Sequence, residues 1–258
     1  MSVNLKKENK GLSANGLRIL GILCLTLGVA GKCLIQNRVL GMTDTTTEQL
    51  LALLSQKQEL MGAATVALVL QMIYCCAAPV FAFLLVEGFC QGGSIRSYLL
   101  RVLGVAVIAE LPYNLAMGDS LLDFGSRNPV FALTLVLVVL YFYRRYSEKT
   151  LQNFAVKALV TVAAILWIGM LRIDDGLAIL VLSVVIWAFR KRTNFRTLGG
   201  CTAAIACTLI SPYYALMPMA FIATHFYNEE QGSGNKVFSY LAYPVILLVI
   251  TLAGKFLL

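Results

Sequence analysis

Long apolar runs separated by short polar segments dominate this chain. Runs of about 18 or more apolar residues with few charges are typical of helices that cross a bilayer. The pattern predicts nine such spans, at residues 17–36, 61–86, 98–117, 129–143, 154–171, 176–190, 197–211, 213–227 and 237–257. We therefore expect an all-α fold, a polytopic transmembrane helical bundle of about nine spans.

The two runs on either side of Ser211-Pro212-Tyr213-Tyr214 have two interpretations. Each contains about 14 residues, whereas a span needs roughly 20, and a proline disfavours helix in the residue before it. Residues 197–227 therefore form either two short buried helices or one re-entrant hairpin.

Composition agrees with the membrane class. Hydrophobic residues make up 59% of the chain and charged residues 13%, against about 45–50% and 25% in soluble domains. The predicted spans leave no room for a soluble domain, so residues 1–258 are expected to form one integral membrane domain in the lipid bilayer. The first apolar run is followed by Gly31-Lys32-Cys33-Leu34 and not by a cleavage site, so it is expected to remain as an anchor.

Basic residues predict the orientation, because cytoplasmic loops of membrane proteins are enriched in Lys and Arg. With the N-terminus inside, 15 of the 21 basic residues fall on the cytoplasmic side: Lys6, Lys7, Lys10, Arg18, Arg96, Arg101, Arg144, Arg145, Lys149, Lys157, Arg190, Lys191, Arg192, Arg196 and Lys236. The C-terminus is then outside. This bias accounts for the net charge of +8, and without a basic groove carrying interleaved aromatics we expect no nucleic-acid partner.

Several kinds of chemistry are not indicated by the sequence. The seven cysteines lack the spacing of a zinc site or a disulfide framework, so they are interpreted as small core residues. No metal site is predicted. Glycine-rich phosphate loops and a nucleophile elbow are also missing, which argues against the chemistry of soluble enzymes.

Glu110 is the candidate catalytic residue. A charged residue at the centre of a spanning helix is disfavoured by roughly 2.5–3.5 kcal/mol, so it usually faces a cavity or a partner. Asn114 lies one helical turn further on the same face. Pro112 between them is expected to kink or unwind the helix and release backbone groups toward a cavity. The alternative is that Glu110 only accepts hydrogen bonds or pairs with an arginine.

Glu87 is expected near the inner interface, since its span runs toward the cytoplasm and Gly88 follows at once. It either pairs with Arg96 or Arg101, or it contacts a substrate or cofactor from the cytosol. His225, at the cytoplasmic end of the eighth predicted span, is more often an interface residue than a catalyst.

Two polar motifs are predicted on the outer face, beside the outer end of the helix that carries Glu110. Arg127 and Asn128 open one span, and Asp174 and Asp175 lie in a tight turn between two others. Together with Asn114 these residues are candidates for binding a polar substrate group. The alternative is that they are ordinary residues of turns and span ends.

The order of these motifs resembles the TraX family. The resemblance rests on Pro79-x-Phe81-Ala82-Phe83-Leu84-Leu85-Val86-Glu87-Gly88-Phe89, Tyr98-Leu99-Leu100-Arg101, Glu110-x-Pro112-Tyr113-Asn114-Leu115-Ala116 and Asn128. Further similar positions are Asp175-Gly176, Tyr227-Asn228 and Phe238-Ser239-Tyr240-Leu241-Ala242-Tyr243-Pro244, so the resemblance covers nearly the whole chain.

TraX proteins are multi-pass proteins of the bacterial inner membrane, named for one that acetylates the N-terminus of a conjugative pilin. The resemblance therefore implies an acyltransferase-type scaffold, with acetyl-CoA as the donor and an envelope protein, glycan or lipid as the acceptor. Arg101 and His225 are then the candidate cofactor contacts on the cytoplasmic side.

The chain departs from the family pattern at two places. Gly28-Val29 stands where the family usually has an adjacent Asp-His pair, and Ile246 stands where it has a histidine. Acyl transfer needs a base, and histidine has a suitable unperturbed pKa. Glu110 would have to serve instead, or the scaffold is divergent or inactive. Two other classes stay open: a small-molecule transporter or flippase in which Pro112 marks a broken helix, and a non-catalytic membrane assembly subunit.

Overall fold

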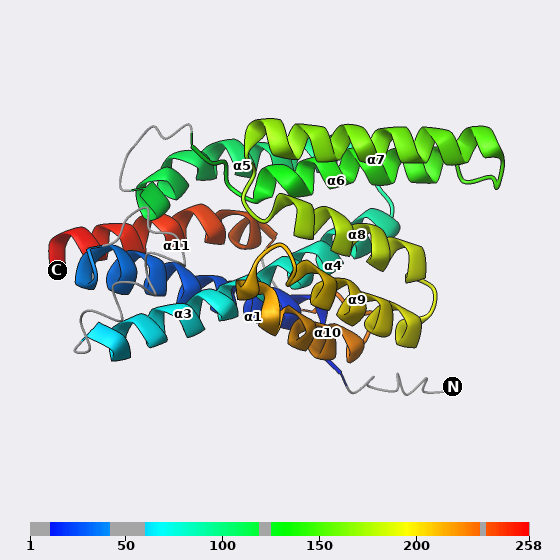
Figure 1. The fold of residues 1–258 in the computed structure, drawn as a ribbon. Coiled ribbons are helices and arrows are strands. Elements are labelled where there is room, and N and C mark those ends of the chain that lie inside the picture. The colour runs from blue at the N-terminus through cyan, green and yellow to red at the C-terminus, as the bar shows by residue number, and fades with distance from the viewer. Residues whose placement is uncertain (1–10, 42–59, 119–124, 233–235, 258) are drawn as a thin grey trace, which may run out of the picture.

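The fold of the described chain is helical throughout its regular elements. The computed structural model describes residues 11–41, 60–118, 125–232 and 236–257, and Figure 1 shows their arrangement. The elements are α1 (Ala14–Ala30), the π-helix η1 (Gly31–Val39), α3 (Met61–Cys75), α4 (Ala77–Cys90), α5 (Ile95–Gly118), α6 (Val130–Arg145), α7 (Leu151–Leu171), α8 (Gly176–Phe189), α9 (Thr193–Cys207), the 3-10 helix η3 (Pro212–Leu216), α10 (Met217–His225) and α11 (Lys236–Leu257). The predicted all-α class is confirmed.

Four of these helical segments are long and apolar enough to cross a membrane. They are Ala14–Val39, where α1 continues into η1, Met61–Cys90, where α4 follows α3, Ile95–Gly118 and Leu151–Leu171. Gly176–Phe189 and Leu241–Phe256 are shorter apolar helices. Each of the nine predicted ranges contains helix, but the count of nine spans stays a prediction.

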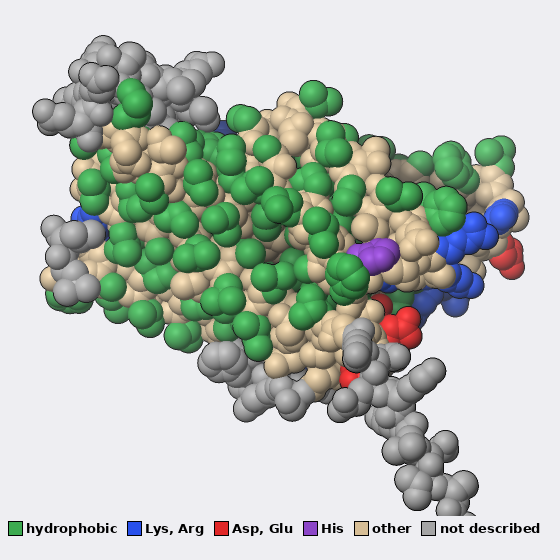
Figure 2. Space-filling model, turned by 90° about the horizontal axis from the view of Figure 1, so that it is seen from below, with side chains coloured by type: hydrophobic (Ala, Val, Ile, Leu, Met, Phe, Trp, Pro, Cys, Tyr) green, Lys and Arg blue, Asp and Glu red, His purple; other side chains and the backbone are tan. Residues whose placement is uncertain are grey.

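Helix α7 shows why the protein belongs in a membrane. Its apolar side chains are exposed around most of the helix, with Leu159 at 69% and Met170 at 76% exposure. A helix that is apolar all round is either buried in protein or surrounded by lipid, and α7 is not buried. Figure 2 shows the same pattern on another face, where apolar side chains form a broad belt.

Charged side chains gather mainly at one end of this belt, which we call the basic end (Figure 2). The exposed arginines at the ends of α6 and α8, Arg144, Arg145 and Arg190, belong to it. The N-terminal end of α1 lies toward the same side of the molecule, and the C-terminus lies at the opposite end (Figure 1).

The helices of the bundle differ strongly in length. At 1.5 Å per residue, α8 and α9 extend about 21–22 Å, whereas Met61–Cys90 extends about 45 Å. In Figure 1, α8, α9 and α10 occupy the half nearer the basic end, and α1, α3, α5 and α11 continue beyond them. The turn before α8 and the turn after α9 therefore lie near the middle of the bundle. The sequence analysis had placed Asp174 and Asp175 at the outer face instead.

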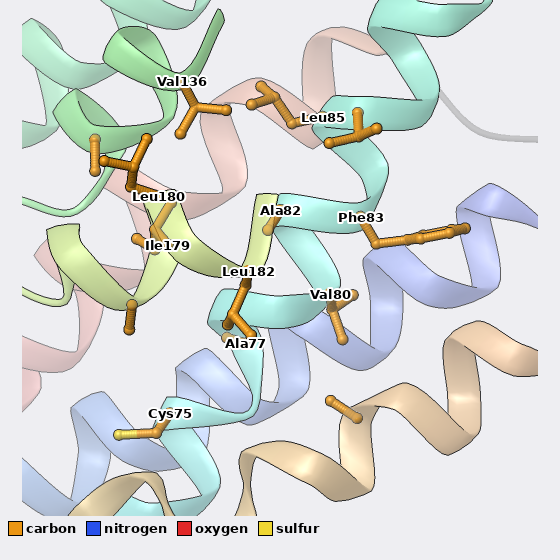
Figure 3. Packing of buried hydrophobic residues seen from close by; sticks show 14 of the residues in the cluster. Cys75, Ala77, Val80, Ala82, Phe83, Leu85, Val136, Ile179, Leu180 and Leu182 are labelled. Carbon is orange, nitrogen blue, oxygen red and sulfur yellow. The ribbon is translucent and has the colours of Figure 1, made fainter. Parts of the chain in front are cut away.

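Helix α4 forms the centre of the packing near these turns. Figure 3 shows Val136 of α6 and Leu180 and Leu182 of α8 converging on the small side chains of α4. Ala82 of α4 is fully buried there. Because alanine adds little volume, α8 can approach α4 closely. The N-terminus of α8 therefore lies inside the bundle.

Helix α5 runs through Pro112 to Gly118 without interruption. The unwinding that the sequence predicted at this proline therefore does not occur. Neighbouring elements hold the segment: α11 packs along α5, and Cys33 Sγ and Asn37 Nδ2 from η1 both donate to the carbonyl of Ala116, each at 3.2 Å.

Candidate functional site

An elongated cavity of about 350 Å³ runs through the bundle from the basic end to its middle. Its mouth at the basic end is polar, and its walls are apolar for most of their length. The mouth contains Arg18, Gln91, Gly92, Gly93, Ser94, Arg101 and Gln231, and the walls include Leu25, Phe81, Leu84, Leu85, Val102, Leu133 and Ile246.

The inner end of the cavity is polar again and is formed by Tyr74, Asp175 and Tyr243. Gly88 near the mouth and Tyr74 at the inner end belong to the same helical segment. They are 14 residues apart, which corresponds to about 21 Å along the helix. The cavity therefore has the length and the apolar walls that suit an extended chain, with polar groups at both ends.

Asp175 is positioned by the turn that starts α8. Its φ of 55° lies in the left-handed region, which aspartate tolerates better than most residues. The hydroxyl of Tyr214 in η3 donates to its Oδ1 at 2.7 Å. The turn between α9 and α10 therefore brings a hydrogen-bond donor to the carboxylate at the inner end of the cavity.

The carboxylate of Asp175 keeps an intermediate exposed fraction because it faces the cavity, although protein atoms surround it. The other titratable side chains near Asp175 are Tyr74, Cys75 and Tyr243.

The adjacent residue, Asp174, has different hydrogen-bond partners from Asp175. The hydroxyl of Tyr113 in α5 donates to Asp174 Oδ2. The backbone N–H of Asp174 donates to the carbonyl of Arg127 at 3.0 Å, and the N–H of Arg127 donates to the carbonyl of Arg172 at 3.0 Å. These bonds join the α7–α8 turn to the segment before α6.

Glu110 is held by that same segment. Arg127 Nη1 donates to Glu110 Oε1 at 2.8 Å, and Asn128 Nδ2 donates to Oε2 at 2.6 Å. Asn128 is fully buried and also donates to the carbonyl of Ala106 at 2.8 Å. Glu110 is not among the residues that line the cavity. Its contacts match the alternative in which a carboxylate pairs with an arginine, and its role as a base stays a prediction.

The pair of Glu110 and Arg127 should stabilise the fold. Hydrogen bonds to charged groups contribute about 1.5–3 kcal/mol, and we expect Glu110→Gln to lie at the lower end because the Arg127 side chain is 30% exposed. A double-mutant cycle with Arg127→Met, measured by unfolding in detergent, would give the coupling energy. Simple additivity of the two variants would contradict a stabilising pair.

The remaining predicted site residues are distributed between the mouth and the surrounding helices. Arg101 lines the mouth, with its guanidinium 5.9 Å from the ring centre of Tyr98. Glu87 accepts from Gln91 Nε2 at 3.3 Å. His225 Nδ1 lies 2.9 Å from the hydroxyl of Thr197. Asn114 is buried in α5. Glu87, His225 and Asn114 do not line the cavity, and the binding roles of all four stay predictions.

Sequence reasoning did not identify the tyrosines of the site. Tyr74, Tyr214 and Tyr243 come from α3, η3 and α11, and they meet only in the folded bundle. Arg18 at the mouth was noted only for its charge. The Tyr243-Pro244 dipeptide in the last span and the Ser211-Pro212-Tyr213-Tyr214 turn marked two of these regions without indicating a role.

The positions that depart from the family pattern fall near the inner end of the cavity. Ile246 lines the cavity itself. Gly28 lies so close to α3 that a Cβ added to it would be 2.1 Å from the Cβ of Tyr74, and Val29 is fully buried. Tyr74 therefore fills the space next to Gly28, and the polar groups at the inner end are Asp175 and tyrosines.

Comparison with known proteins decides the family. A family described as TraX protein matches residues 33–253, most of the chain. The chain belongs to the TraX family. A curated relative of this TraX family member is described as a probable fimbrial assembly protein FimC, serogroup H1, from Dichelobacter nodosus. It is 25% identical over 202 residues, which cover 69% of this chain and 80% of the relative. No solved structure matches.

Within residues 11–41, 60–118, 125–232 and 236–257 of the TraX chain, no three His, Cys, Asp or Glu side chains are grouped in a way that would hold a metal ion. Asp174 and Asp175 are adjacent, and Tyr113 and Tyr214 donate hydrogen bonds to them. Asp175 is the carboxylate among the residues that line the inner end of the cavity.

Proposed function

We propose that this TraX family member transfers an acyl group from a thioester donor to an amine or hydroxyl group of an envelope molecule. The observation that carries the proposal is the cavity that connects a mouth with two arginines to a buried carboxylate about 21 Å along the bundle. We place the protein in the bacterial cytoplasmic membrane, with the basic end toward the cytoplasm, where acyl-CoA thioesters are available.

The mouth of the cavity is suited to the phosphates of acetyl-CoA. Arg18 comes from α1 and Arg101 from α5, so the two guanidinium groups reach the mouth from different helices. Gly92 and Gly93 have φ values of +91° and +103°, and their lack of side chains leaves room there. The apolar walls beyond them suit the pantetheine arm, and we expect the thioester toward the inner end of the cavity, where Asp175 lies.

The residues at the inner end supply the acid-base chemistry. As the acceptor nitrogen or oxygen bonds to the thioester carbonyl carbon, Asp175 takes the acceptor's proton and the carbonyl electron pair moves to its oxygen. When the carbonyl re-forms and the carbon–sulfur bond breaks, Asp175 returns the proton to the leaving thiolate. A carboxylate on the cavity wall suits this role, because it can take a proton from the acceptor and return it to the leaving group.

The acceptor is expected at the middle of the membrane. Asp175 lies there because the short helix α8 begins at that level and the short helix α9 ends at that level. The family is named for a pilin acetylase and the D. nodosus relative is described as a fimbrial assembly protein. We therefore propose a membrane-anchored envelope protein as the first acceptor to test, with a glycan or a lipid as the alternatives.

The test uses the purified protein in lipid nanodiscs with acetyl-CoA that is radiolabelled in the acetyl group. Membrane extract from the source cells supplies the acceptors, and label should move to a protein, glycan or lipid. Heat-denatured protein controls for chemical acetylation. Transfer no faster than in that control, with every class of extract, would contradict acyl transfer.

A second function is favoured by the name of the relative alone. A fimbrial assembly protein can act by holding other envelope proteins in the membrane without any reaction. In that case the protein would co-purify with an envelope protein, and replacing Asp175 by Asn would leave assembly unchanged. Retained fimbrial assembly in the Asp175→Asn strain would favour this function over catalysis.

A further inference from the structure

We infer that the hydroxyl of Tyr243 is the hydrogen-bond donor that stabilises the negative oxygen formed when the acceptor attacks the donor's carbonyl. This inference rests on the proposed acyl transfer and deepens it by naming a second catalytic residue. Tyr243 belongs to α11 and lines the inner end of the cavity together with Asp175 and Tyr74.

The hydrogen bonding of Tyr243 is incomplete. Its side chain is 9% exposed, and its hydroxyl has no partner with ordinary hydrogen-bond geometry among the described residues, although the Tyr74 side chain lies next to it. Burying a polar group without a partner is unfavourable. The Tyr243 side chain lines the cavity, so we expect its hydroxyl to exchange its contact with Tyr74 for a hydrogen bond to an oxygen of a ligand that reaches the inner end.

Two other tyrosines near the carboxylates already donate to them. Tyr113 donates to Asp174 and Tyr214 donates to Asp175. Tyr243 can therefore donate to a ligand without first giving up a bond to either carboxylate. Asp175 and Tyr243 then have different roles. The carboxylate accepts the proton of the attacking group, and the neutral hydroxyl donates a hydrogen bond to the developing oxyanion.

Surrounding residues fix the position of the hydroxyl. Ile246 lies one helical turn from Tyr243 and lines the same cavity. Leu247, also one turn further along α11, is fully buried, and α11 packs along α5. A donor held in this way does not have to reorganise during the reaction, which is the condition for effective oxyanion stabilisation.

The kinetic test compares Tyr243→Phe with Tyr227→Phe. Each variant removes one buried hydroxyl that makes no hydrogen bond of ordinary geometry, with Gln91 beside Tyr227 and Tyr74 beside Tyr243, but Tyr227 does not line the cavity. We expect Tyr243→Phe to lower kcat by about 10²–10³-fold with little change in KM, and Tyr227→Phe to behave like the unchanged protein. Equal kcat values in the two variants would overturn the inference.

A spectroscopic test works without turnover. Acetyl-CoA labelled with ¹³C at the carbonyl is bound to the protein in nanodiscs without an acceptor, and its infrared carbonyl band is recorded. A hydrogen bond from Tyr243 should lower the frequency relative to free acetyl-CoA, and Tyr243→Phe should reverse that shift, whereas Tyr227→Phe should not. Bound acetyl-CoA with the same band in Tyr243→Phe would overturn the role of Tyr243 and leave acyl transfer standing. No binding at all would overturn the donor, and with it both proposals.

Discussion

Replacing Asp175 by Asn is expected to lower the rate of acyl transfer by about 10²–10⁴-fold, the usual contribution of a general base. The amide cannot take the acceptor's proton, although it can still accept the hydrogen bond from Tyr214 at the position of Oδ1. Binding of acetyl-CoA at the distant mouth should change little. The measurement is the initial rate of labelled acetyl transfer, together with the dissociation constant of acetyl-CoA.

A matched control makes this prediction specific. Glu148→Gln is the same chemical change on an exposed residue in the loop between α6 and α7, and it should leave the rate unchanged. Full activity of Asp175→Asn would rule out this carboxylate as the base.

Replacing Gly28 by Ala is expected to have the largest effect on stability, about 3 kcal/mol or more, since overpacking of a filled core typically costs 1–3 kcal/mol. The added Cβ would lie 2.1 Å from Tyr74 Cβ and 2.8 Å from Tyr74 Cγ. Atoms so close to the Tyr74 backbone cannot swing away, so α1 and α3 would have to separate. Unfolding in mixed micelles would measure the loss, and activity should fall with it because Tyr74 lines the cavity.

Gly104→Ala is the matched control for this variant. Gly104 also lies inside a helix, but a Cβ added there would meet nothing within 4 Å. Alanine is the better helix former by roughly 0.5–1 kcal/mol, so this variant should be as stable as the unchanged protein or more stable. Similar losses in both variants would mean that the contact with Tyr74 is not the cause.

The motif analysis identified the family correctly. The spacing of the rare polar residues within apolar runs is distinctive, and it can be read from one sequence without an alignment. It also predicted that the segment with Arg127 and Asn128 lies beside the turn with Asp174, and backbone hydrogen bonds join Arg127 to Asp174. It chose Glu110 as the candidate base, because Glu110 falls within an apolar run whereas Asp175 falls in a predicted turn. Only the tertiary contacts show that Glu110 is paired with Arg127 and that Asp175 lines the cavity.

The sequence by itself determined that this protein is helical and embedded in a membrane, and that it is a TraX family member. Hydropathy and motif spacing are local properties, so they can be read along the chain. Only the tertiary structure showed that α8 and α9 end near the middle of the bundle, and that Tyr74, Asp175 and Tyr243 meet at the end of one cavity. These residues are 68 or more positions apart in the chain, and helix packing, which depends on all neighbours at once, decides whether they touch.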